Sequence, residues 1–337
     1  MRTLLIGGTH FIGPPLVRRL VRLGHAVAVF HRGRTHAGLP TEVQHILGDR
    51  EHLADHAAEL RRFRPQVVID MIAYTEPHAL GLLEVFRGLA ERAVVLSSGD
   101  AYRAYGVFHG TESGPVEPVP LQEGAPLRGV PFPYRAMARG PDDLAYHYDK
   151  IPVEQAILGE PSLPGTVLRL PMVHGPGDHQ HRLYPYLRRM NDGRPVILLD
   201  EAMARWRCTR GYVEDVAAAI ALAATDPRAA GCVYNVGEAV ALPEADWVRL
   251  IGKAAGWEGE VVAVPGGGMP VLGNMAQDLV TDTGRIRQEL GYREEVPPAE
   301  ALRQTVEWER ANPPVPPPRL DYVEEDRALA ELKGRAT

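Results

Sequence analysis

The sequence predicts an α/β protein built on a doubly wound parallel sheet, with a smaller C-terminal α/β lobe. Three observations predict this class. Short apolar runs alternate with helical patterns through the first half of the chain, the runs are continuous in their apolar character, and a glycine-rich turn follows the first of them. Continuous apolar strands are typical of a parallel sheet that helices cover on both faces.

The first half contains five such strands in order. We expect them at 3–7, 26–30, 43–49, 66–72 and 92–98, with helices at 12–24, in the stretch that ends at Phe63, and at 77–90. Residues 106–141 interrupt the order because they are dense in glycine and proline. Loops this long inside a compact domain are usually functional lids or mobile segments.

The second half resumes the alternation. We expect a helix at 142–160, a strand at 166–173, a helix at 182–192, strands at 195–199 and 232–237, and helices at 212–225, 243–256 and 297–311. We assign 1–172 and 211–236 to the sheet domain and 173–210 and 237–311 to the smaller lobe. The remainder, 312–337, is a proline-rich link followed by a charged tail, which we expect to form an appended helix or arm.

Composition restricts the function. The 337 residues are 45% hydrophobic and 24% charged, with a formal net charge of −6, which suits a soluble globular protein and disfavours nucleic acid and anionic membranes as partners. The longest apolar run, 216–224, is too short to span a bilayer. The two cysteines have no disulfide or metal-type spacing, and no signal peptide is evident, so we expect a cytoplasmic protein.

The glycine turn at 7–13 is the first motif that carries chemistry. Glycines after a first strand let backbone N–H groups approach a pyrophosphate at a helix N-terminus. Gly7 and Gly13 fit the outer positions of such a motif, and His10 stands at its centre. Pro14 and Pro15 are tolerated only in the first helical turn, so they place the helix start close to Gly13. An ordinary strand-to-helix turn is the alternative.

The end of the second strand indicates which dinucleotide binds. A site for NAD usually carries an acidic residue there for the ribose 2′-hydroxyl, whereas this chain has Arg32 and Arg34. Guanidinium groups suit a 2′-phosphate, and His10 could donate to the same group. The position predicts a preference for NADP over NAD, and a solvated basic turn is the alternative.

Tyr146 and Lys150 form the second motif. They stand four residues apart in the expected helix 142–160, hence on one face of it. A neighbouring ammonium lowers the pKa of a phenol, so the pair can move a proton while a hydride moves at the adjacent carbon. We expect Tyr148 to point elsewhere and Glu154 to position the lysine. Ser98, at the end of the fifth strand, could hold the reacting oxygen.

These motifs together resemble one family. GGTHFIG (7–13), LSSGDAY (96–102), YHYDK (146–150), LRLPMVHGPGD (168–178), GYVEDVA (211–217), YNVGE (234–238) and DTGRIRQELGY (282–292) are similar, in this order, to motifs of the extended short-chain dehydrogenase/reductases of the NAD-dependent epimerase/dehydratase family. The glycine turn is most similar to the branch that contains the chloroplast stem-loop RNA-binding proteins and bacterial relatives.

The resemblance implies a Rossmann fold, a nicotinamide cofactor and a set of site residues. Ser98, Tyr146 and Lys150 would be catalytic, with Tyr105 and Tyr134 as fallback acids for Tyr146. The candidate cofactor-binding residues are Gly7, Thr9, His10, Phe11, Ile12, Gly13, Arg32, Asp49, Arg50, Ala73, Lys150, Pro171 and Val173. The family also implies a homodimer that packs through the helices expected at 77–90 and 142–160. Pro152, two residues past the lysine, is expected to kink its helix.

Two further clusters concern the substrate. The loop 174–182 contains three histidines, Asp178 and Arg182, and we favour a substrate loop over a metal site because the ligand spacing is irregular. Arg182 is a candidate for a substrate phosphate, and Arg207, in the stretch 204–212, for a nucleotide-sugar diphosphate. An exposed edge strand is the alternative for the second stretch.

The sequence thus predicts an enzyme that transfers hydride at a secondary alcohol of a sugar-like or nucleotide-sugar substrate, with NADP or NAD, as an epimerase, dehydratase or reductase. The alternative is a non-catalytic dinucleotide-sensing or RNA-associated protein on the same fold. A small-molecule substrate, no membrane and no bound metal are expected.

Overall fold

The central element of the fold is one parallel sheet. The computed structural model of the chain describes residues 1–35, 38–266, 271 and 273–335. The strands follow the order β10-β6-β5-β4-β1-β2-β3, and every neighbouring pair is parallel. Their bounds are β1 (Arg2–Ile6), β2 (Ala26–His31), β3 (Gln44–Leu47), β4 (Val67–Asp70), β5 (Arg92–Ser98), β6 (Gly165–Leu170) and β10 (Val233–Asn235). The chain crosses to opposite sides of β1, so the predicted doubly wound class is confirmed.

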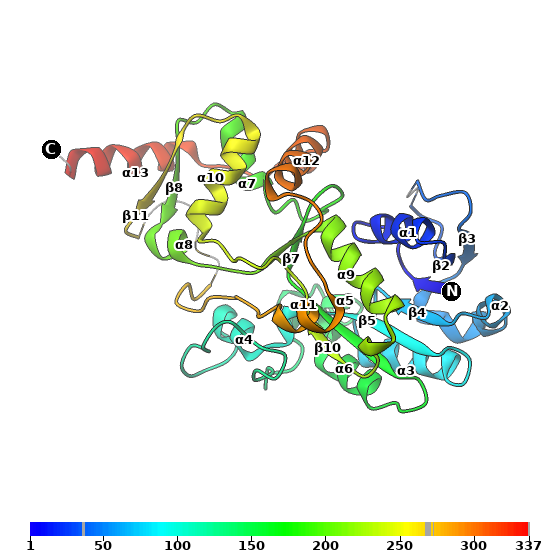
Figure 1. Cartoon of the computed structure of the whole chain (residues 1–337). Helices are drawn as coiled ribbons and strands as arrows, with labels where there is room; N and C mark the ends of the chain where they lie inside the picture. Colours follow the sequence, from blue (N-terminus) through cyan, green and yellow to red (C-terminus); the bar gives the residue numbers. More distant parts are fainter. Residues whose placement is uncertain (36–37, 267–270, 272, 336–337) are drawn as a thin grey trace.

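Helices cover both faces of this sheet. On one face lie α1 (Gly13–Arg22) and α9 (Val213–Thr225), and on the other α2 (Ala57–Phe63), α3 (Glu76–Phe86) and α6 (Lys150–Leu158) (Figure 1). Alternate residues of β1 serve the two cores, because Leu5 packs with α1 and α9 while Leu4 and Ile6 pack with α3 and α6. Two buried faces explain why the strands are continuously apolar in the sequence.

The segment between β5 and α6 is where prediction and structure differ most. It contains η2 (Gly99–Ala101), α4 (Arg103–His109), η3 (Arg135–Met137) and α5 (Leu144–His147). The sequence missed α4, and the single helix expected at 142–160 is wrong, because α5 ends at His147 and α6 begins at Lys150. Residues 110–134 contain no helix or strand, which agrees with the long loop expected there.

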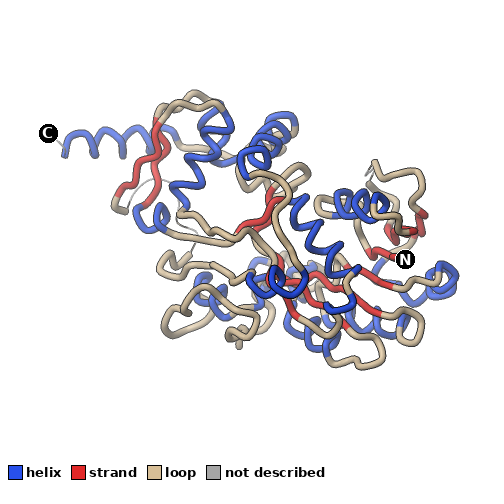
Figure 2. Tube along the Cα trace, in the orientation of Figure 1, coloured by secondary structure: helices blue, strands red, loops and turns tan. Residues whose placement is uncertain are grey.

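The smaller lobe has its own apolar core. It contains α7 (Tyr184–Asn191), β8 (Val196–Asp200), α8 (Glu201–Arg205), α10 (Glu244–Ala255), β11 (Glu260–Val264) and α12 (Pro298–Ala311), and β8 pairs in parallel with β11. Figure 2 shows these helices and strands gathered apart from the main sheet. The sequence missed α8 and β11. The domain boundaries given above stay a prediction.

A short two-stranded sheet and four further helical segments complete the described structure. β7 (Met172–His174) pairs with β9 (Arg210–Tyr212). Pro171 separates β7 from β6, so the strand expected at 166–173 is divided. The remaining elements are η1 (Arg50–His56), η4 (Pro227–Ala229), α11 (Gly284–Leu290) and α13 (Tyr322–Arg335). The expected C-terminal arm is helical: α13 extends away from the lobe (Figure 1), and Glu325 near its start forms a buried ion pair with Arg189. Over the described residues, we find no helix with the length and apolar character needed to cross a membrane.

Candidate active site

A cavity of about 630 Å³ lies at the carboxyl end of β1. Its wall combines the glycine turn, the end of β2, the start of η1 and the segment after β4, and it reaches His179 of the predicted substrate loop. The lining residues include Gly7, Gly8, Thr9, His10, Phe11, Ile12, Arg32, Arg34, Asp49, Arg50, Tyr74, Leu96, Leu144 and His179. Most of the predicted cofactor residues therefore share one cavity.

The glycine turn has the geometry that a phosphate turn requires. Gly7 and Gly8 have φ angles of +83° and +102°, which L-residues with side chains rarely adopt. At Gly13 an added Cβ would lie 2.2 Å from the Gly8 carbonyl oxygen, so a side chain cannot fit there. Helix α1 begins at this glycine with Pro14 and Pro15 in its first turn, as predicted. The turn therefore fits a dinucleotide pyrophosphate at the start of α1.

Arg32 and Arg34 both line the cavity and are exposed. Within the described part of the chain, neither guanidinium has a carboxylate within ion-pair distance. His10 Nε2 lies 2.8 Å from the Thr35 hydroxyl, so the imidazole is held at the rim and does not block the cavity. This edge can therefore accept an anionic group.

Another part of the cavity wall contains Arg50, whose charge is paired with that of a neighbouring carboxylate. Arg50 is buried and donates to Asp70 Oδ2 at 2.7 Å and to the carbonyl of His78. Its Nε is buried without a partner among the described residues. Asp49 caps η1 by accepting the Glu51 N–H at 3.2 Å. Both residues line the cavity as predicted, but the Arg50 guanidinium is committed mainly to Asp70.

Lys150 is the buried cation beside this cavity. Its ammonium donates to the carbonyl oxygens of Ala73 (2.7 Å) and Leu96 (2.9 Å) and lies 4.6 Å from the centre of the Tyr74 ring. Burial lowers the pKa of Lys150 to about 8 against the opposing effects of nearby carboxylates, led by Asp100. An ammonium has three donors, so one remains for a ligand. The Ala73 side chain is fully buried, and its carbonyl holds the lysine.

The expectation that Tyr146 and Lys150 share one helix face is wrong. Asp149 caps α6, and Tyr146 belongs to the separate helix α5, where its ring lies 4.5 Å from the Arg135 guanidinium. Pro152 gives the physical reason: a proline ring clashes with the carbonyl four residues earlier, here that of Tyr148, so the helix cannot continue in that direction. Pro152 thus lies in the first turn of α6 and terminates the pattern, and the expected kink is wrong.

Tyr148 occupies the place predicted for Tyr146. Its ring lies 5.6 Å from the Lys150 ammonium, and its hydroxyl donates to Asp100 Oδ2 at 2.8 Å. The Tyr134 hydroxyl donates to the same carboxylate oxygen at 2.9 Å. Burial first, and then the Asp100 carboxylate, raise the pKa of the Tyr148 phenol, and the neighbouring Ser98 hydroxyl acts in the opposite direction. The expectation that Tyr148 points elsewhere is therefore wrong.

Ser98 is oriented by the same short segment. It caps η2, and its Oγ accepts the backbone N–H of Asp100 at 3.2 Å, so its own proton can be donated to the Tyr148 oxygen or to a ligand. Asp100 is almost fully buried, and its Oδ1 has no partner in the described residues. The sequence analysis did not identify Asp100, although a carboxylate two residues after Ser98 was a visible signal.

Other expectations near this cluster are revised. Glu154 does not hydrogen-bond Lys150; it forms a buried ion pair with Arg169 at 2.6 Å and accepts from Ser97. Tyr105 is half-buried, and burial raises the pKa of its phenol. Pro171 and Val173 do not line the cavity.

Ion pairs within the loop and to α12 stabilise the loop 174–182. Arg182 donates to the buried Asp178 at 2.6 Å and to the Val173 carbonyl at 3.0 Å, and His181 pairs with Glu309 of α12. His179 alone of the three histidines reaches the cavity, where its ring packs edge-on against Phe11. The described residues contain no group of three or more ligands arranged for a metal ion.

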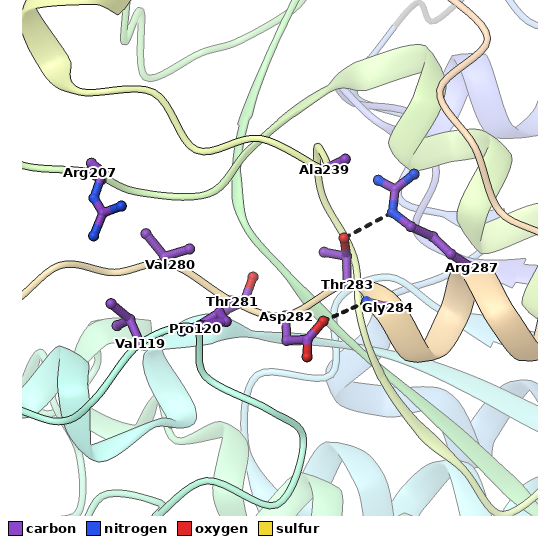
Figure 3. Close-up of a pocket in the computed structure, with 10 residues that line it drawn as sticks. All are labelled: Val119, Pro120, Arg207, Ala239, Val280, Thr281, Asp282, Thr283, Gly284 and Arg287. Carbon is purple, nitrogen blue, oxygen red and sulfur yellow. Dashed lines mark hydrogen bonds between the residues drawn. The ribbon is translucent and has the colours of Figure 1, made fainter.

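Arg207 lies in a second hollow of about 340 Å³, which shares no lining residue with the first. Figure 3 shows this pocket between the segment 279–287 and the loop at Val119 and Pro120. Arg207 is paired with Asp278 at 2.8 Å.

The parallel sheet and the glycine turn agree with the dinucleotide-binding fold that the motifs predicted. Residues 138–237 match the model of the NAD dependent epimerase/dehydratase family, which is the family that the motifs resemble.

Two curated relatives extend over most of the chain. It is 25% identical to 2'-dehydrokanamycin reductase of Streptomyces kanamyceticus, over 79% of this chain and 70% of that protein. It is 22% identical to the chloroplast stem-loop binding protein of 41 kDa b of Arabidopsis thaliana, over 77% of this chain and 65% of the relative. This chain thus matches about two thirds of each relative's length.

Solved structures share the fold at low identity. An epimerase of Methanothermobacter thermautotrophicus superposes with a TM-score of 0.69 at 18% identity, covering 92% of both chains. The UDP-glucose 4-epimerase of Thermotoga maritima, solved with UDP-glucose, gives 0.67 at 20% identity and covers 92% of this chain and 99% of that one. The UDP-glucose 4-epimerase of Thermus thermophilus, solved with NAD, gives 0.65 at 24% identity, covering 93% and 100%. These neighbours show that the chain shares their fold.

Proposed function

We propose that the chain reduces a ketone of a sugar-like substrate to a secondary alcohol with NADPH or NADH, and catalyses the reverse reaction less readily. The observation that supports this most is the cluster of Ser98, Tyr148 and Lys150 beside a cavity whose glycine turn fits a dinucleotide. The relative named 2'-dehydrokanamycin reductase supports the same reaction class.

The roles of the side chains follow from their contacts. A bound nicotinamide would supply the hydride. Ser98 has a free hydroxyl proton with which to hold the substrate oxygen, and Tyr148 is the acid that would give that oxygen its proton. The remaining donor of Lys150 would hold the cofactor ribose and keep a positive charge beside the phenolate that forms.

Asp100 supports reduction as the favoured direction. The Asp100 carboxylate accepts a hydrogen bond from the Tyr148 hydroxyl. This hydrogen bond stabilises the protonated phenol, and the negative charge of the carboxylate disfavours the phenolate. A phenol that stays protonated is a proton donor, which reduction of a ketone requires and oxidation of an alcohol does not. The double hydrogen bond from Tyr134 and Tyr148 therefore distinguishes this site from a simple tyrosine–lysine pair.

We propose NADP as the preferred cofactor. Arg32 and Arg34 line the cavity and have no carboxylate partner in the described chain, so both can bind a 2′-phosphate without breaking an existing ion pair. We also propose a cytoplasmic homodimer. It is supported by two free cysteines and by exposed leucines on the two helices named for the interface, Leu80 on α3 and Leu158 on α6.

The test is the pair Tyr148→Phe and Tyr146→Phe. NADPH oxidation is followed with a panel of keto-sugars, after native mass spectrometry has identified any co-purified dinucleotide. Tyr148→Phe is expected to lower turnover by about 10²-fold or more, since it removes the proton donor, while Tyr146→Phe stays close to wild type. The opposite order would contradict the assignment. Tight NADPH binding without turnover on any keto-sugar would favour the non-catalytic alternative, which the stem-loop binding relative keeps open.

A further inference from the structure

The second hollow has walls of two kinds. Val119, Pro120, Ala239 and Val280 supply apolar surface, and Arg207, Arg287, Thr281, Thr283 and Asp282 supply polar groups (Figure 3). A volume of about 340 Å³ with mixed walls suits one small hydroxylated ring. Whether the pocket favours a cationic or an anionic ring depends on which of its ionic side chains are already paired with a group of opposite charge.

Both arginines are committed to carboxylates. Arg207 donates through Nε and Nη2 to Asp278 Oδ2, at 2.9 and 2.8 Å. Arg287 donates to both oxygens of Glu294, at 2.9 and 2.6 Å, to the Thr283 hydroxyl at 3.0 Å and to the Gly237 carbonyl at 2.9 Å. A phosphate entering here would compete with carboxylates already in place.

Asp282 is the ionic group of this pocket that has no counter-ion within the described chain. Its Oδ1 accepts the Gly284 N–H at 2.8 Å, where α11 begins, and its other oxygen has no hydrogen-bond partner there. With both arginines paired, the uncompensated charge of the pocket is negative. Such a site favours a cation over a phosphate.

Thr281 gives an independent sign of a ligand. Its side chain is 9% exposed, and its Oγ1 is buried without a hydrogen-bond partner in the described residues. Figure 3 shows this hydroxyl directed toward the middle of the group of lining residues. A buried hydroxyl without a partner is costly, and a ligand hydroxyl would satisfy it.

We propose that this pocket binds a hydroxylated ring that carries an ammonium group, an amino sugar or aminocyclitol, with the ammonium on Asp282 and a ring hydroxyl on Thr281. A nucleotide-sugar diphosphate does not fit this charge. The proposal goes beyond hydride transfer and does not depend on it, because binding here requires neither Tyr148 nor the cofactor.

The test compares three probes by saturation-transfer NMR and calorimetric titration on the whole chain without cofactor. The probes are 2-deoxystreptamine, its uncharged ring analogue myo-inositol, and glucose 1-phosphate. We expect 2-deoxystreptamine to bind about tenfold more tightly than myo-inositol, since it adds a charge-assisted hydrogen bond, and glucose 1-phosphate to bind most weakly.

Variants locate the binding in this pocket. Asp282→Asn keeps an oxygen for the Gly284 N–H, so the turn that leads into α11 is retained, and should remove the preference for 2-deoxystreptamine. Thr281→Val should weaken both ring ligands by about threefold without changing their ratio. Asp246→Asn, which alters a half-exposed carboxylate on α10, is the control that should change neither. Thermal melting of each variant verifies folding.

Three results would overturn the proposal. In the first, glucose 1-phosphate binds most tightly of the three probes. In the second, the affinity for 2-deoxystreptamine is unchanged in the folded variants Asp282→Asn and Thr281→Val. In the third, none of the probes binds. Each is obtained without turnover, so it leaves the test of Tyr148 untouched.

Discussion

Arginines line both hollows described above, three in the cofactor cavity and two in the second pocket, and their partners give the two hollows different charges. In the cofactor cavity, Arg32 and Arg34 extend from the end of β2 without a carboxylate beside them in the described chain. In the second pocket, Arg207 and Arg287 are each held by an acidic residue, and Asp282 is left uncompensated. Arg32 and Arg34 can therefore offer their positive charge to a ligand. In the second pocket the charge of each arginine is already paired within the protein.

This difference shows why arginines in a sequence do not by themselves indicate an anion site. Arg207 was predicted to bind a nucleotide-sugar diphosphate, but it stands beside Asp278, which lies 71 residues further along the chain. Arg182 was a candidate for a substrate phosphate, but it braces its own loop through Asp178. The charge available to a ligand is what remains after such pairs have formed.

The largest effect is expected where the charge is free. The double variant Arg32→Ala with Arg34→Ala should lower the affinity for NADPH by about 100-fold, because two charge-assisted hydrogen bonds to the 2′-phosphate are lost. The affinity for NADH, which lacks that phosphate, should change by less than about threefold. Fluorescence titration of both cofactors gives the two numbers.

The matched control is Arg207→Ala in the second pocket, which should leave both cofactor affinities unchanged. Equal losses for NADPH and NADH in the double variant would show that the arginines hold the turn in shape and do not bind a phosphate. The proposed difference in charge between the two hollows would then not hold for the cofactor cavity.

The cofactor turn could be predicted from the sequence because its determinants are local. Gly7, Gly13 and the two prolines act within a few residues, and the structure places the helix start at Gly13 as expected. The strands were predicted for the same reason, since a buried strand is a continuous apolar run.

The tyrosine that we propose as catalytic, Tyr148, could not be predicted in this way. The spacing of Tyr146 and Lys150 is helical on paper, and only the clash between Pro152 and the Tyr148 carbonyl divides the segment. The proline is visible in the sequence, but the sequence alone does not show whether it kinks a helix or lies in the first turn of a new one. Asp100, Tyr134 and the partners of the arginines depend on contacts between distant segments, which no local pattern contains.

The next effect concerns pH and separates the two hollows again. The pKa of Lys150 is lowered to about 8, mainly by burial, so the ammonium beside the cofactor cavity is lost above that pH. We expect kcat/KM for ketone reduction to fall by about tenfold per pH unit above pH 8. The second pocket has no lysine in its lining, so binding of uncharged myo-inositol there should not change over this range.

Stability should move in the opposite direction to activity. In the unfolded chain, a lysine keeps its proton to a pKa of about 10.4. Between about pH 8 and 10.4 the unfolded state therefore binds more protons, so the contribution of Lys150 to stability rises with pH. Thermal melting of the wild type and of Lys150→Met isolates this contribution. A parallel loss of activity and folding above pH 8 would mean that the activity loss reports unfolding and not the lysine.

The smallest effect tests whether pairing alone makes the second pocket disfavour anions. Asp278→Asn leaves an oxygen for the Arg207 backbone N–H but removes the counter-charge of its guanidinium. Affinity for glucose 1-phosphate should rise by about threefold, a modest gain because the Arg207 side chain is 46% exposed and water and salt screen it. The gain should disappear at high salt.

Glu294→Gln provides the comparison for that variant. Arg287 keeps its hydrogen bonds to the Thr283 hydroxyl and the Gly237 carbonyl when Glu294 loses its charge, so its guanidinium stays fixed and the gain should be smaller. If neither variant increases phosphate binding, the apolar walls and Asp282 exclude anions without help from the paired acids. The two hollows would then differ by shape and by one carboxylate, and the pairing of the arginines would be a consequence of folding with no effect on what binds.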